Sequence, residues 1–588
     1  MTVIDPHLQW LYEDTPAQER AATRVSVMFE WHGDLEALTS FGMRLFVTTG
    51  GIISADMPLS KLPDVHALGL ESIDLSRQAY PSLDVSRPDI GADKLQPVIG
   101  AETGKGVIIG IVDTGIDYTH ASFCKPDGTT RLLYLWDQRL TLVKSRPGGK
   151  PRYPMEALPA NMTDPYQTGV EFTEQAINAA LTSGKPLRTR DTLLAHGSHV
   201  MGIAAGNGVA TAGKPPTSFV GVAPAADLIV VATDFKFASI RLGFEYILER
   251  AKQLGRPCVV NLSLGMPLGA RDGMGKEEKG IDAVLTTSGR AIVIAAGNNA
   301  DKKRHVQGKI AQGAQDTLTF SVDTKQTGDA ITVQIWYGLK STAERFDVEV
   351  RDPTGALPDA QKRLGNAVVN IQPQINLPQH AKNLITIAIK RDNRVRRISP
   401  GIWSIKLSGK VVGSGAQAGA YHAYLDAPGK TGVPPTAFSS SQVSQASTVC
   451  IPATATKAIS VGSYITKPSA STHKLSDFSS QGPALDDRSL PTLCAPGQLI
   501  TSVRAVNAQQ GPKGASFFAM QGTSMATPHV AGVVAGMLQV DSTLDQDDIV
   551  AMLGAQADAP PSPASNMWGK GRLNALKSIT AAKPSTGS

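Results

Sequence analysis

The sequence has few cysteines, little net charge and no long apolar run. Four cysteines in 588 residues are too few and too scattered for a disulfide framework, and they lack the spacing of a metal site. A net charge of +6 without a basic block gives no reason to expect nucleic-acid binding. No apolar run reaches membrane length, so we expect no membrane-spanning segment. The absence of a His-Glu-x-x-His motif removes the commonest metalloprotease interpretation, and we assign no metal and no cofactor.

The amino-terminal residues also lack the features of a secretion signal. Met1 to His7 contain no basic start followed by an apolar stretch. We therefore expect a cytoplasmic location, with non-classical export as the alternative.

A serine stands where a tight turn leads into an apolar helix. The run Gly522 to His529 (GTSMATPH) places Ser524 among small residues at the predicted helix start. Apolar residues then follow at helical spacing, namely Val530, Val533, Val534, Met537 and Leu538. The unpaired N–H groups and positive dipole end of such a helix would stabilise an oxyanion beside Ser524. Close packing of small residues is the alternative explanation for this run alone.

A nucleophilic serine requires a base and a third group that orients the base. The buried parallel strand expected over Val107 to Val112 ends in Asp113, which places a carboxylate at the carboxyl edge of a sheet. Ligands bind at that edge in open α/β sheets. His196 opens a second small-residue helix and is the better candidate base, although His199 lies one turn further on the same helix.

A fourth candidate is the side-chain amide of Asn298. It follows an apolar strand over Ile292 to Ala296 and could donate a hydrogen bond to an oxyanion. Each candidate also has a structural explanation, since Asp113 could cap a helix, His196 could be a core histidine and Asn298 could belong to a turn. The occurrence of all four, each at a strand end or a helix start, favours a catalytic site.

These segments resemble those of the subtilisin family of serine proteases, the subtilases. The motifs containing Asp113, His196 and Ser524 occur in the family's order, and the resemblance covers roughly residues 96–300 and 440–582. It implies a triad of these three residues, with Asn298 and the Ser524 amide as the oxyanion hole. It also implies an α/β fold with a mostly parallel sheet flanked by helices. Ser198 stands where the family usually has threonine, which is a conservative departure.

The same resemblance suggests where a substrate would bind. An extended peptide is expected to add as a strand beside Gly265, with a second wall formed by the loop after the strand Leu228 to Ala232. The substrate-binding candidates are Asp234, Phe235, Ser263, Leu264, Gly265, Asn299 and Cys450. Cys450 replaces a smaller residue in the first specificity pocket and predicts small or medium apolar P1 residues. Simple packing of the thiol in the interior is the alternative.

The first 85 residues predict a separate domain. Their βαββαβ order suggests a ferredoxin-like unit and resembles the subtilase propeptide, which implies a self-processing zymogen inhibited by its own prosegment. Gln78-Ala79-Tyr80 resembles a propeptide end, but Pro81 would follow the scissile bond and disfavour cleavage there. A permanent amino-terminal domain is the alternative.

A long insertion separates Asn299 from Cys450. It contains short alternating runs, at 317–322, 330–337, 346–350, 384–389, 402–407 and 420–425, which predict an antiparallel, jelly-roll-like β-sandwich. This layout resembles the subtilase branch of the clostridial germination proteases, as do Trp136-Asp137-Gln138 and an expected helix over Glu171 to Leu181. We therefore expect a propeptide-like domain at 1–85, a catalytic domain at 86–305 and 436–588, and the inserted sandwich at 306–435.

The sequence favours a serine endopeptidase that acts on extended protein or peptide substrates through an acyl-enzyme. A peptide ligase or macrocyclase would use the same triad but exclude water from the acyl-enzyme. A catalytically silent binding scaffold is the third hypothesis. No nucleic-acid or membrane partner is expected.

Overall fold

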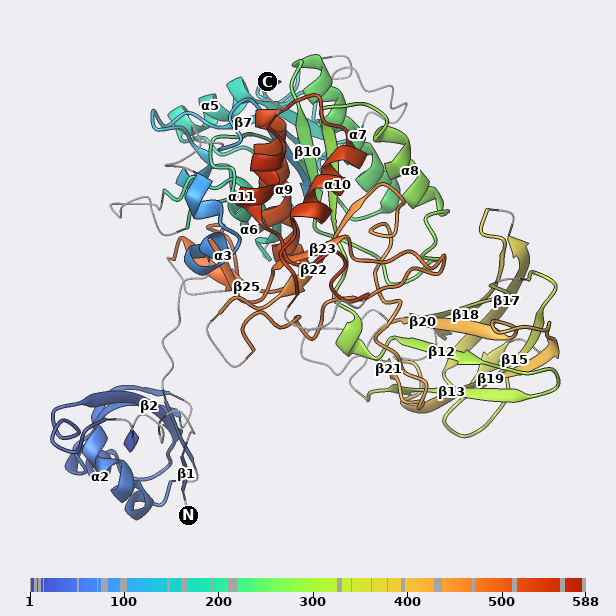
Figure 1. Cartoon of the computed structure of the whole chain (residues 1–588), viewed down its shortest axis with the longest axis horizontal. Helices are drawn as coiled ribbons and strands as arrows, with labels where there is room; N and C mark the ends of the chain where they lie inside the picture. The colour runs from blue at the N-terminus through green and yellow to red at the C-terminus, as the bar shows by residue number, and fades with distance from the viewer. Residues whose placement is uncertain are drawn as a thin grey trace. The chain divides into compact units, whose positions relative to one another are not determined.

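The computed structural model divides the chain into two compact units, Met1–Tyr80 and Pro81–Ser588, which are described separately (Figure 1). The structure describes residues 2–4, 8, 12–13, 15–49, 52–70, 72–75, 83–95, 103–144, 149–159, 168–192, 194–209, 219–324, 330–339, 341–360, 362–377, 379–392, 397–427, 436–467, 471–509, 515–560 and 566–583. The expected propeptide end at Gln78 to Tyr80 lies outside these residues. In the described part of the chain, no helix is both long and apolar enough to cross a membrane.

The first unit is a five-stranded sheet in the order β1-β5-β2-β4-β3. Its elements are β1 (Val3–Ile4), β2 (Arg24–Glu30), α2 (Leu35–Ser40), β3 (Arg44–Thr49), β4 (Ile52–Pro58), the 3-10 helix η1 (Leu59–Leu68) and β5 (Ser72–Leu75). Strands β2 to β5 pair antiparallel in the order that a βαββαβ unit adopts, and β1 adds in parallel to β5. The second connection is a 3-10 helix in place of the expected helix, with Pro63 inside it.

Eight strands form the central sheet of the second unit, in the order β23-β22-β11-β10-β6-β9-β7-β8. They are β6 (Ile108–Asp113), β7 (Leu132–Asp137), β8 (Val170–Thr173), β9 (Asp227–Ala232), β10 (Cys258–Leu262), β11 (Arg290–Ala295), β22 (Ile459–Tyr464) and β23 (Leu493–Pro496). All neighbouring pairs are parallel except β7 and β8. The expected mostly parallel sheet is therefore confirmed. Register pairs Asp113 with Ala232 and Leu262 with Ile294, so the residues after these strands meet at one edge.

Helices cover both faces of this sheet (Figure 1). They are α3 (Leu83–Asp89), α5 (Glu174–Ser183), α6 (His196–Ala205), α7 (Phe237–Gln253), α8 (Lys276–Val284), α9 (Thr523–Val540), α10 (Gln546–Gln556) and α11 (Ala575–Ala581), with short 3-10 turns η2 (Ala92–Lys94), η3 (Ala121–Phe123) and η4 (Ala300–Lys302). Alternate residues of β6 face opposite cores. Ile109 and Ile111 pack with α6 and α9, whereas Ile108 and Val112 pack with α7 and α8.

The insertion forms two antiparallel sheets, ordered β12-β20-β14-β18-β17-β16 and β15-β19-β13-β21. The strands are β12 (His305–Lys309), β13 (Gln315–Val322), β14 (Ala330–Tyr337), β15 (Arg345–Arg351), β16 (Arg363–Leu364), β17 (Ala367–Leu377), β18 (Lys382–Arg391), β19 (Gly401–Val411), β20 (Ala420–Asp426) and β21 (Ala437–Phe438). One apolar core lies between the sheets and includes Trp403, Phe320 and Ile387. The jelly-roll description and the domain boundaries stay predictions.

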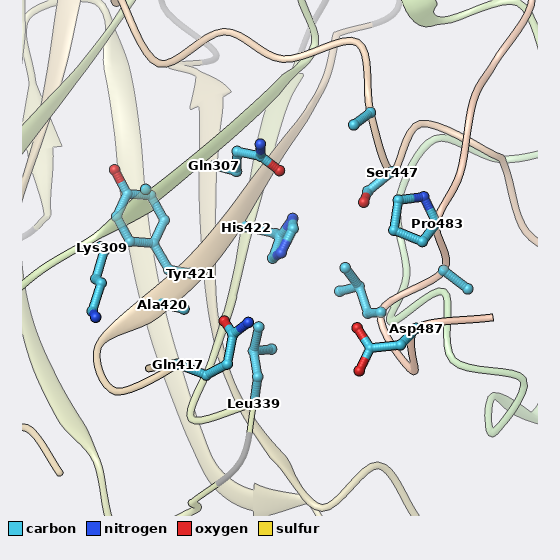
Figure 2. A pocket seen from close by; sticks show the side chains of 14 residues that line it. Gln307, Lys309, Leu339, Gln417, Ala420, Tyr421, His422, Ser447, Pro483 and Asp487 are labelled. Atoms are coloured by element: carbon cyan, nitrogen blue, oxygen red, sulfur yellow. The ribbon is translucent and has the colours of Figure 1, made fainter. Parts of the chain in front are cut away.

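A groove of about 550 Å³ lies where this sandwich meets the loops that flank strand β22 of the central sheet. Figure 2 shows Tyr421 and His422 of β20 on one side, and Ser447, Pro483 and Asp487 on the other. The insertion therefore contacts the sheet-bearing part directly.

One helix prediction was wrong in its extent. The first three residues of the expected helix over Glu171 to Leu181 belong to strand β8, and α5 begins only at Glu174. Thr173 caps that helix by accepting a hydrogen bond from the amide of Ala176. The side chain of Asn574 caps α11 in the same way, by accepting from the amide of Lys577. In both helices a side-chain cap fixes the start.

Candidate active site

Asp113 and His196 contact each other at the carboxyl edge of the sheet. Asp113 is the last residue of β6 and is 1% exposed, and the Nδ1 of His196 lies 2.7 Å from its Oδ1. Because a carboxylate can only accept, Nδ1–H donates and Nε2 remains the basic nitrogen. Burial opposes protonation, but the charges of Asp113 and Asp191 outweigh it, and the net effect raises the pKa of His196.

The backbone before His196 is strained. Ala195, the residue preceding α6, has φ of +55°, a left-handed conformation that costs an alanine about 1–2 kcal/mol. Its side chain is fully buried and packs with Phe518, Ala505 and Ala508. The surrounding packing therefore holds the imidazole at the helix start in this position.

A buried carboxylate that the sequence did not single out lies beneath this pair. Asp191 accepts hydrogen bonds from the Thr114 hydroxyl at 2.6 Å and from both the amide and the hydroxyl of Ser198. Burial is the main cause that raises the pKa of Asp191. The Thr114 hydroxyl in turn accepts from the amide of Gly197, next to His196. Asp191 could have been suspected only because it lies five residues before the candidate base.

The Ser198 hydroxyl explains why the departure from threonine is tolerated. It donates to Asp191 and accepts from the backbone amide of Asp117 at 2.8 Å. Threonine carries the same hydroxyl, so either residue satisfies both partners.

The other motif histidines are core residues. His199 is completely buried, lies 3.0 Å from the carbonyl of Phe518, and burial lowers its pKa to about 3. His529 lies 2.9 Å from the Ser86 hydroxyl, and burial lowers its pKa to about 4. Both imidazoles are neutral near pH 7 and are held by internal partners. These contacts favour His196 over His199 as the base.

Ser524 is the second residue of α9 and is half-buried. Its hydroxyl donates to the carbonyl of Ser263 at 3.2 Å, and the Ser263 hydroxyl donates to the carbonyl of Ser524 at 2.9 Å. Within the described residues, no hydrogen bond joins Ser524 to His196. Helices α6 and α9, which begin with these segments, pack directly on each other. The structure thus brings Ser524 together with the predicted substrate strand.

Asn298 lies beside the start of α9. Its Oδ1 accepts from the backbone amide of Thr523 at 2.9 Å and from the Thr523 hydroxyl at 3.1 Å. These two bonds fix the amide plane, so that Nδ2 stays available as a donor on the exposed side. A Cβ at Gly522, which has φ of +150°, would come within 3.2 Å of that nitrogen. A larger residue at position 522 would therefore crowd the donor.

The predicted substrate walls follow strands β10 and β9, which lie on either side of β6 in the sheet. Ser263, Leu264 and Gly265 come directly after β10, and the next residue, Met266, pairs antiparallel with Ile451. Gly265 is exposed, as strand addition requires.

Asp234 and Phe235, the predicted opposite wall, are the second and third residues after β9. The carboxylate of Asp234 accepts from Lys236, which lowers the pKa of Asp234 to about 2. Phe235 is 45% exposed and has φ of +61°, so its ring is presented to solvent at the edge that carries Asp113. The amide of Thr233 bonds the carbonyl of Asp113 and joins the two strand ends.

Asn299 and Cys450 are in direct contact. The amide of Asn299 donates to the Cys450 sulfur at 2.8 Å, and the thiol is 3% exposed. A Cβ on Gly265 would lie 2.9 Å from the Cys450 Cβ, and one on Gly297 would lie 2.5 Å from its sulfur. Cys450 therefore fills the space between Gly265 and Gly297, and burial raises the pKa of its thiol.

All four cysteines are free thiols, and the part of the chain that the structure describes contains no cluster of three or more His, Cys, Asp or Glu side chains that could hold a metal ion.

The site as a whole can supply three groups for chemistry on a carbonyl. These are the oriented imidazole of His196, the hydroxyl of Ser524 at a helix start and the amide donor of Asn298.

Comparison with known proteins agrees with this geometry. The model of the subtilase family matches residues 104–335 and 417–571, more than half of the chain. The serine protease AprX of Bacillus subtilis (strain 168) is 33% identical over 140 residues, which is 22% of this chain and 32% of that protein. The minor extracellular protease Vpr of the same organism is 23% identical over 86% of this chain and 55% of its own length. The chain thus spans less than two thirds of either relative.

A solved structure, the CspB protease of Clostridium perfringens, superposes with a TM-score of 0.68 at 24% identity. The superposition covers 84% of this chain and 97% of the CspB chain. The predicted subtilisin-like fold, and the resemblance to a clostridial member of the family, are confirmed.

One prediction from the sequence is wrong. The amino-terminal residues led us to expect a cytoplasmic location, whereas Vpr, which aligns with most of this chain, is named an extracellular protease. The inference failed because it rested on Met1 to His7 alone. The match of the family model over most of the catalytic part establishes that the chain belongs to the subtilase family of serine proteases.

Proposed function

We propose that this chain is an extracellular serine endopeptidase in which Asp113, His196 and Ser524 form the catalytic triad. The observation that carries the proposal is the 2.7 Å contact of Asp113 with His196 at the sheet edge that Ser263 and Asn298 also occupy. Asp113 holds the imidazole in the tautomer whose Nε2 can accept a proton, and its charge stabilises the imidazolium that forms.

The first step is the attack of the Ser524 hydroxyl on the substrate carbonyl, with transfer of its proton to His196 Nε2. In the resting arrangement the hydroxyl donates to the Ser263 carbonyl, so it rotates towards the imidazole when a substrate binds. The oxyanion would be stabilised by Asn298 Nδ2 and the Ser524 amide at the start of α9. His196 then protonates the leaving amine, and water releases the acyl group.

Extended polypeptide is the substrate class that fits the site best. Its backbone would pair with Ser263 to Gly265, which requires a substrate segment without secondary structure. The proposed pocket between Gly265 and Asn299 is filled in part by Cys450, which favours small or medium apolar P1 residues.

Labelling with a fluorophosphonate tests the nucleophile. We expect one adduct on Ser524, mapped by mass spectrometry, and hydrolysis of a casein-derived peptide by the same preparation. Ser524→Ala should lose both, and the exposed Ser183→Ala should keep both. Hydrolysis that persists in Ser524→Ala, or an adduct on another serine, would contradict the proposal.

We also propose that residues 1–85 act as a self-cleaved inhibitory prosegment. The support is the strand order of the first unit, which is that of a βαββαβ domain, and the compactness of Met1–Tyr80 as a unit of its own. Intact-mass analysis of wild type beside Ser524→Ala tests this directly. A shorter wild-type protein and a full-length variant are expected, whereas identical amino termini would exclude self-cleavage.

Ligation is the alternative reaction for the same triad. It differs only in the acceptor, because an amine in place of water would take the acyl group. The products of the peptide assay distinguish ligation from hydrolysis, because a ligase would give cyclic or transpeptidated peptides beside the hydrolysed peptide or in place of it. A catalytically silent scaffold would give neither product nor adduct.

A further inference from the structure

The inserted sandwich holds the chain segment that follows Gly265. The amide of Gly269 donates to the side chain of Gln334 in β14 at 2.9 Å. Ala270 packs in an apolar cluster with Trp336 and Leu384 of the sandwich. The segment that extends one wall of the proposed P1 pocket is thus built against the insertion.

An ion-pair cluster adds a second attachment at the same place. The carboxylate of Asp272, which is 3% exposed, lies 3.0 Å from His380 and 2.8 Å from the ammonium group of Lys382. Lys382 is the first residue of β18 in the sandwich, and His380 lies in the turn before that strand. The segment that follows Gly265 is therefore attached to the insertion on both sides of Arg271, through Gly269 and Ala270 before it and through Asp272 after it.

Arg271 links both walls of the pocket. It is 2% exposed, and its Nε donates to the carbonyl of Val449 at 2.9 Å, one residue before Cys450. Its Nη1 donates to the carbonyl of Gly269 at 3.0 Å, and its Nη2 donates to that of Pro267. A single guanidinium group therefore sets the spacing between the segment after Gly265 and the segment that carries Cys450.

Tyr424 of the sandwich positions this guanidinium. The carbon at the centre of the Arg271 guanidinium lies 3.5 Å from the centre of the Tyr424 ring, close enough for a cation–π interaction. The phenol donates to the carbonyl of Ser447 at 3.0 Å, and the ring stacks on His305 at 4.6 Å. Burial, together with the neighbouring His422 and Arg271, holds the pKa of His305 well below its usual range, so this imidazole stays neutral beside the cation.

The back of the pocket is closed by the same residues. Asn299, Arg271 and Tyr424 line one cavity, together with Pro267, Thr448, Arg304 and His305, and its volume is about 10 Å³. A cavity of this size holds about one water molecule. The space behind Asn299 is therefore too small for a substrate side chain while Tyr424 and Arg271 keep these positions.

We propose that Arg271 is a positioning residue through which Tyr424 of the inserted sandwich sets the depth of the P1 pocket. This inference rests on the proposed function, because it needs Asn299 and Cys450 to contact the substrate. Removal of the Tyr424 ring would free the guanidinium, separate the two walls and admit larger P1 side chains. The insertion then acts on selectivity, in addition to any contribution to stability.

The test compares Tyr424→Leu with Tyr421→Leu. Tyr421 lies on the same strand and is also fully buried, but its hydroxyl bonds Asp316 and its ring packs on Phe346, away from Arg271. The measured quantity is the ratio of kcat/KM for a peptide with Phe at P1 to that for the same peptide with Ala at P1. This ratio cancels the fraction of enzyme that is folded.

We expect the Phe/Ala ratio to rise about tenfold in Tyr424→Leu, mainly through a lower KM for the Phe peptide, because pocket contacts of one or a few methylene groups change selectivity by such factors. It should stay within about twofold of wild type in Tyr421→Leu. Gln334→Leu removes the acceptor of the Gly269 amide and should shift the Phe/Ala ratio in the same direction. This variant replaces Tyr424→Leu in the test if Tyr424→Leu does not fold.

An unchanged ratio in Tyr424→Leu and Gln334→Leu would overturn this inference alone, provided that Ser524→Ala abolishes wild-type cleavage. An equal rise in Tyr421→Leu would also overturn it, because general loosening of the sandwich would then be the cause. Cleavage that does not depend on Ser524 would overturn the proposed function and the inference with it.

Discussion

Replacement of Asp113 by asparagine removes the negative charge that faces the His196 imidazole. The side chains are 2.7 Å apart, Asp113 is 1% exposed, and the substitution changes the volume very little. Opposite charges about 4 Å apart contribute about 4 kcal/mol at an effective dielectric constant of about 20. At about 1.4 kcal/mol per tenfold in rate, loss of this term from the transition state corresponds to about a thousandfold.

Asparagine also disturbs the tautomer. Its amide can donate to Nδ1, which would move the hydrogen of the imidazole to Nε2 and remove the base, so the total loss in kcat approaches about 10⁴-fold. The substitution also removes a cause of the raised pKa of His196. Because the base must be neutral, wild-type activity rises as pH passes through this raised pKa, and the acid limb of the variant should move to lower pH.

The assay is kcat/KM for a fluorogenic peptide between pH 5 and pH 10, normalised by active-site titration. Asp347→Asn, an exposed carboxylate of the sandwich that pairs with Lys410, is the matched control and should keep both the rate and the pH profile. A loss of less than tenfold in Asp113→Asn, with an unmoved acid limb, would refute the role assigned to Asp113.

Three further outcomes follow from the site. Asn298→Ala should lower kcat by about 10²–10³-fold with little change in KM, a magnitude borrowed from the corresponding donor of subtilisin, and a loss confined to KM would contradict its role. Ser198→Ala leaves the buried Asp191 short of a donor and should lower the free energy of unfolding by about 1–3 kcal/mol in urea titrations, whereas Ser198→Thr should retain stability. Cys450→Gly empties the space between Gly265 and Gly297 and should favour Phe over Ala at P1 in a peptide library. A faster Ala peptide would show that the thiol only packs in the interior.

Much of the fold could be predicted because buried parallel strands and small-residue helices have strong local signals. Strand β6 and helix α9 fall where apolar periodicity places them. Strand β17 was not predicted because Pro373 in its middle argues against a strand, and because its residues from Gln372 to Asn376 are exposed.

The residues of the candidate site also fall into two groups, those that the sequence predicts and those that it does not. Asp113, His196 and Asn298 stand at strand ends and helix starts, which the sequence reveals. Asp191 and Arg271 could not be predicted, because each has one partner that lies more than 70 positions away in the sequence and comes close only in the fold, namely Thr114 for Asp191 and Val449 for Arg271. A lone Asp or Arg in a polar segment carries no pattern that indicates such a contact.

The central claim is that His196 and Ser524 act as one unit, although the resting hydroxyl bonds Ser263. Measurement of kcat for His196→Ala, Ser524→Ala and the double variant tests it most directly. Residues that share one step lose their effect together, so the double variant should be no slower than either single variant. Losses that multiply in the double variant would mean that the two side chains act independently, and the proposed mechanism would be wrong.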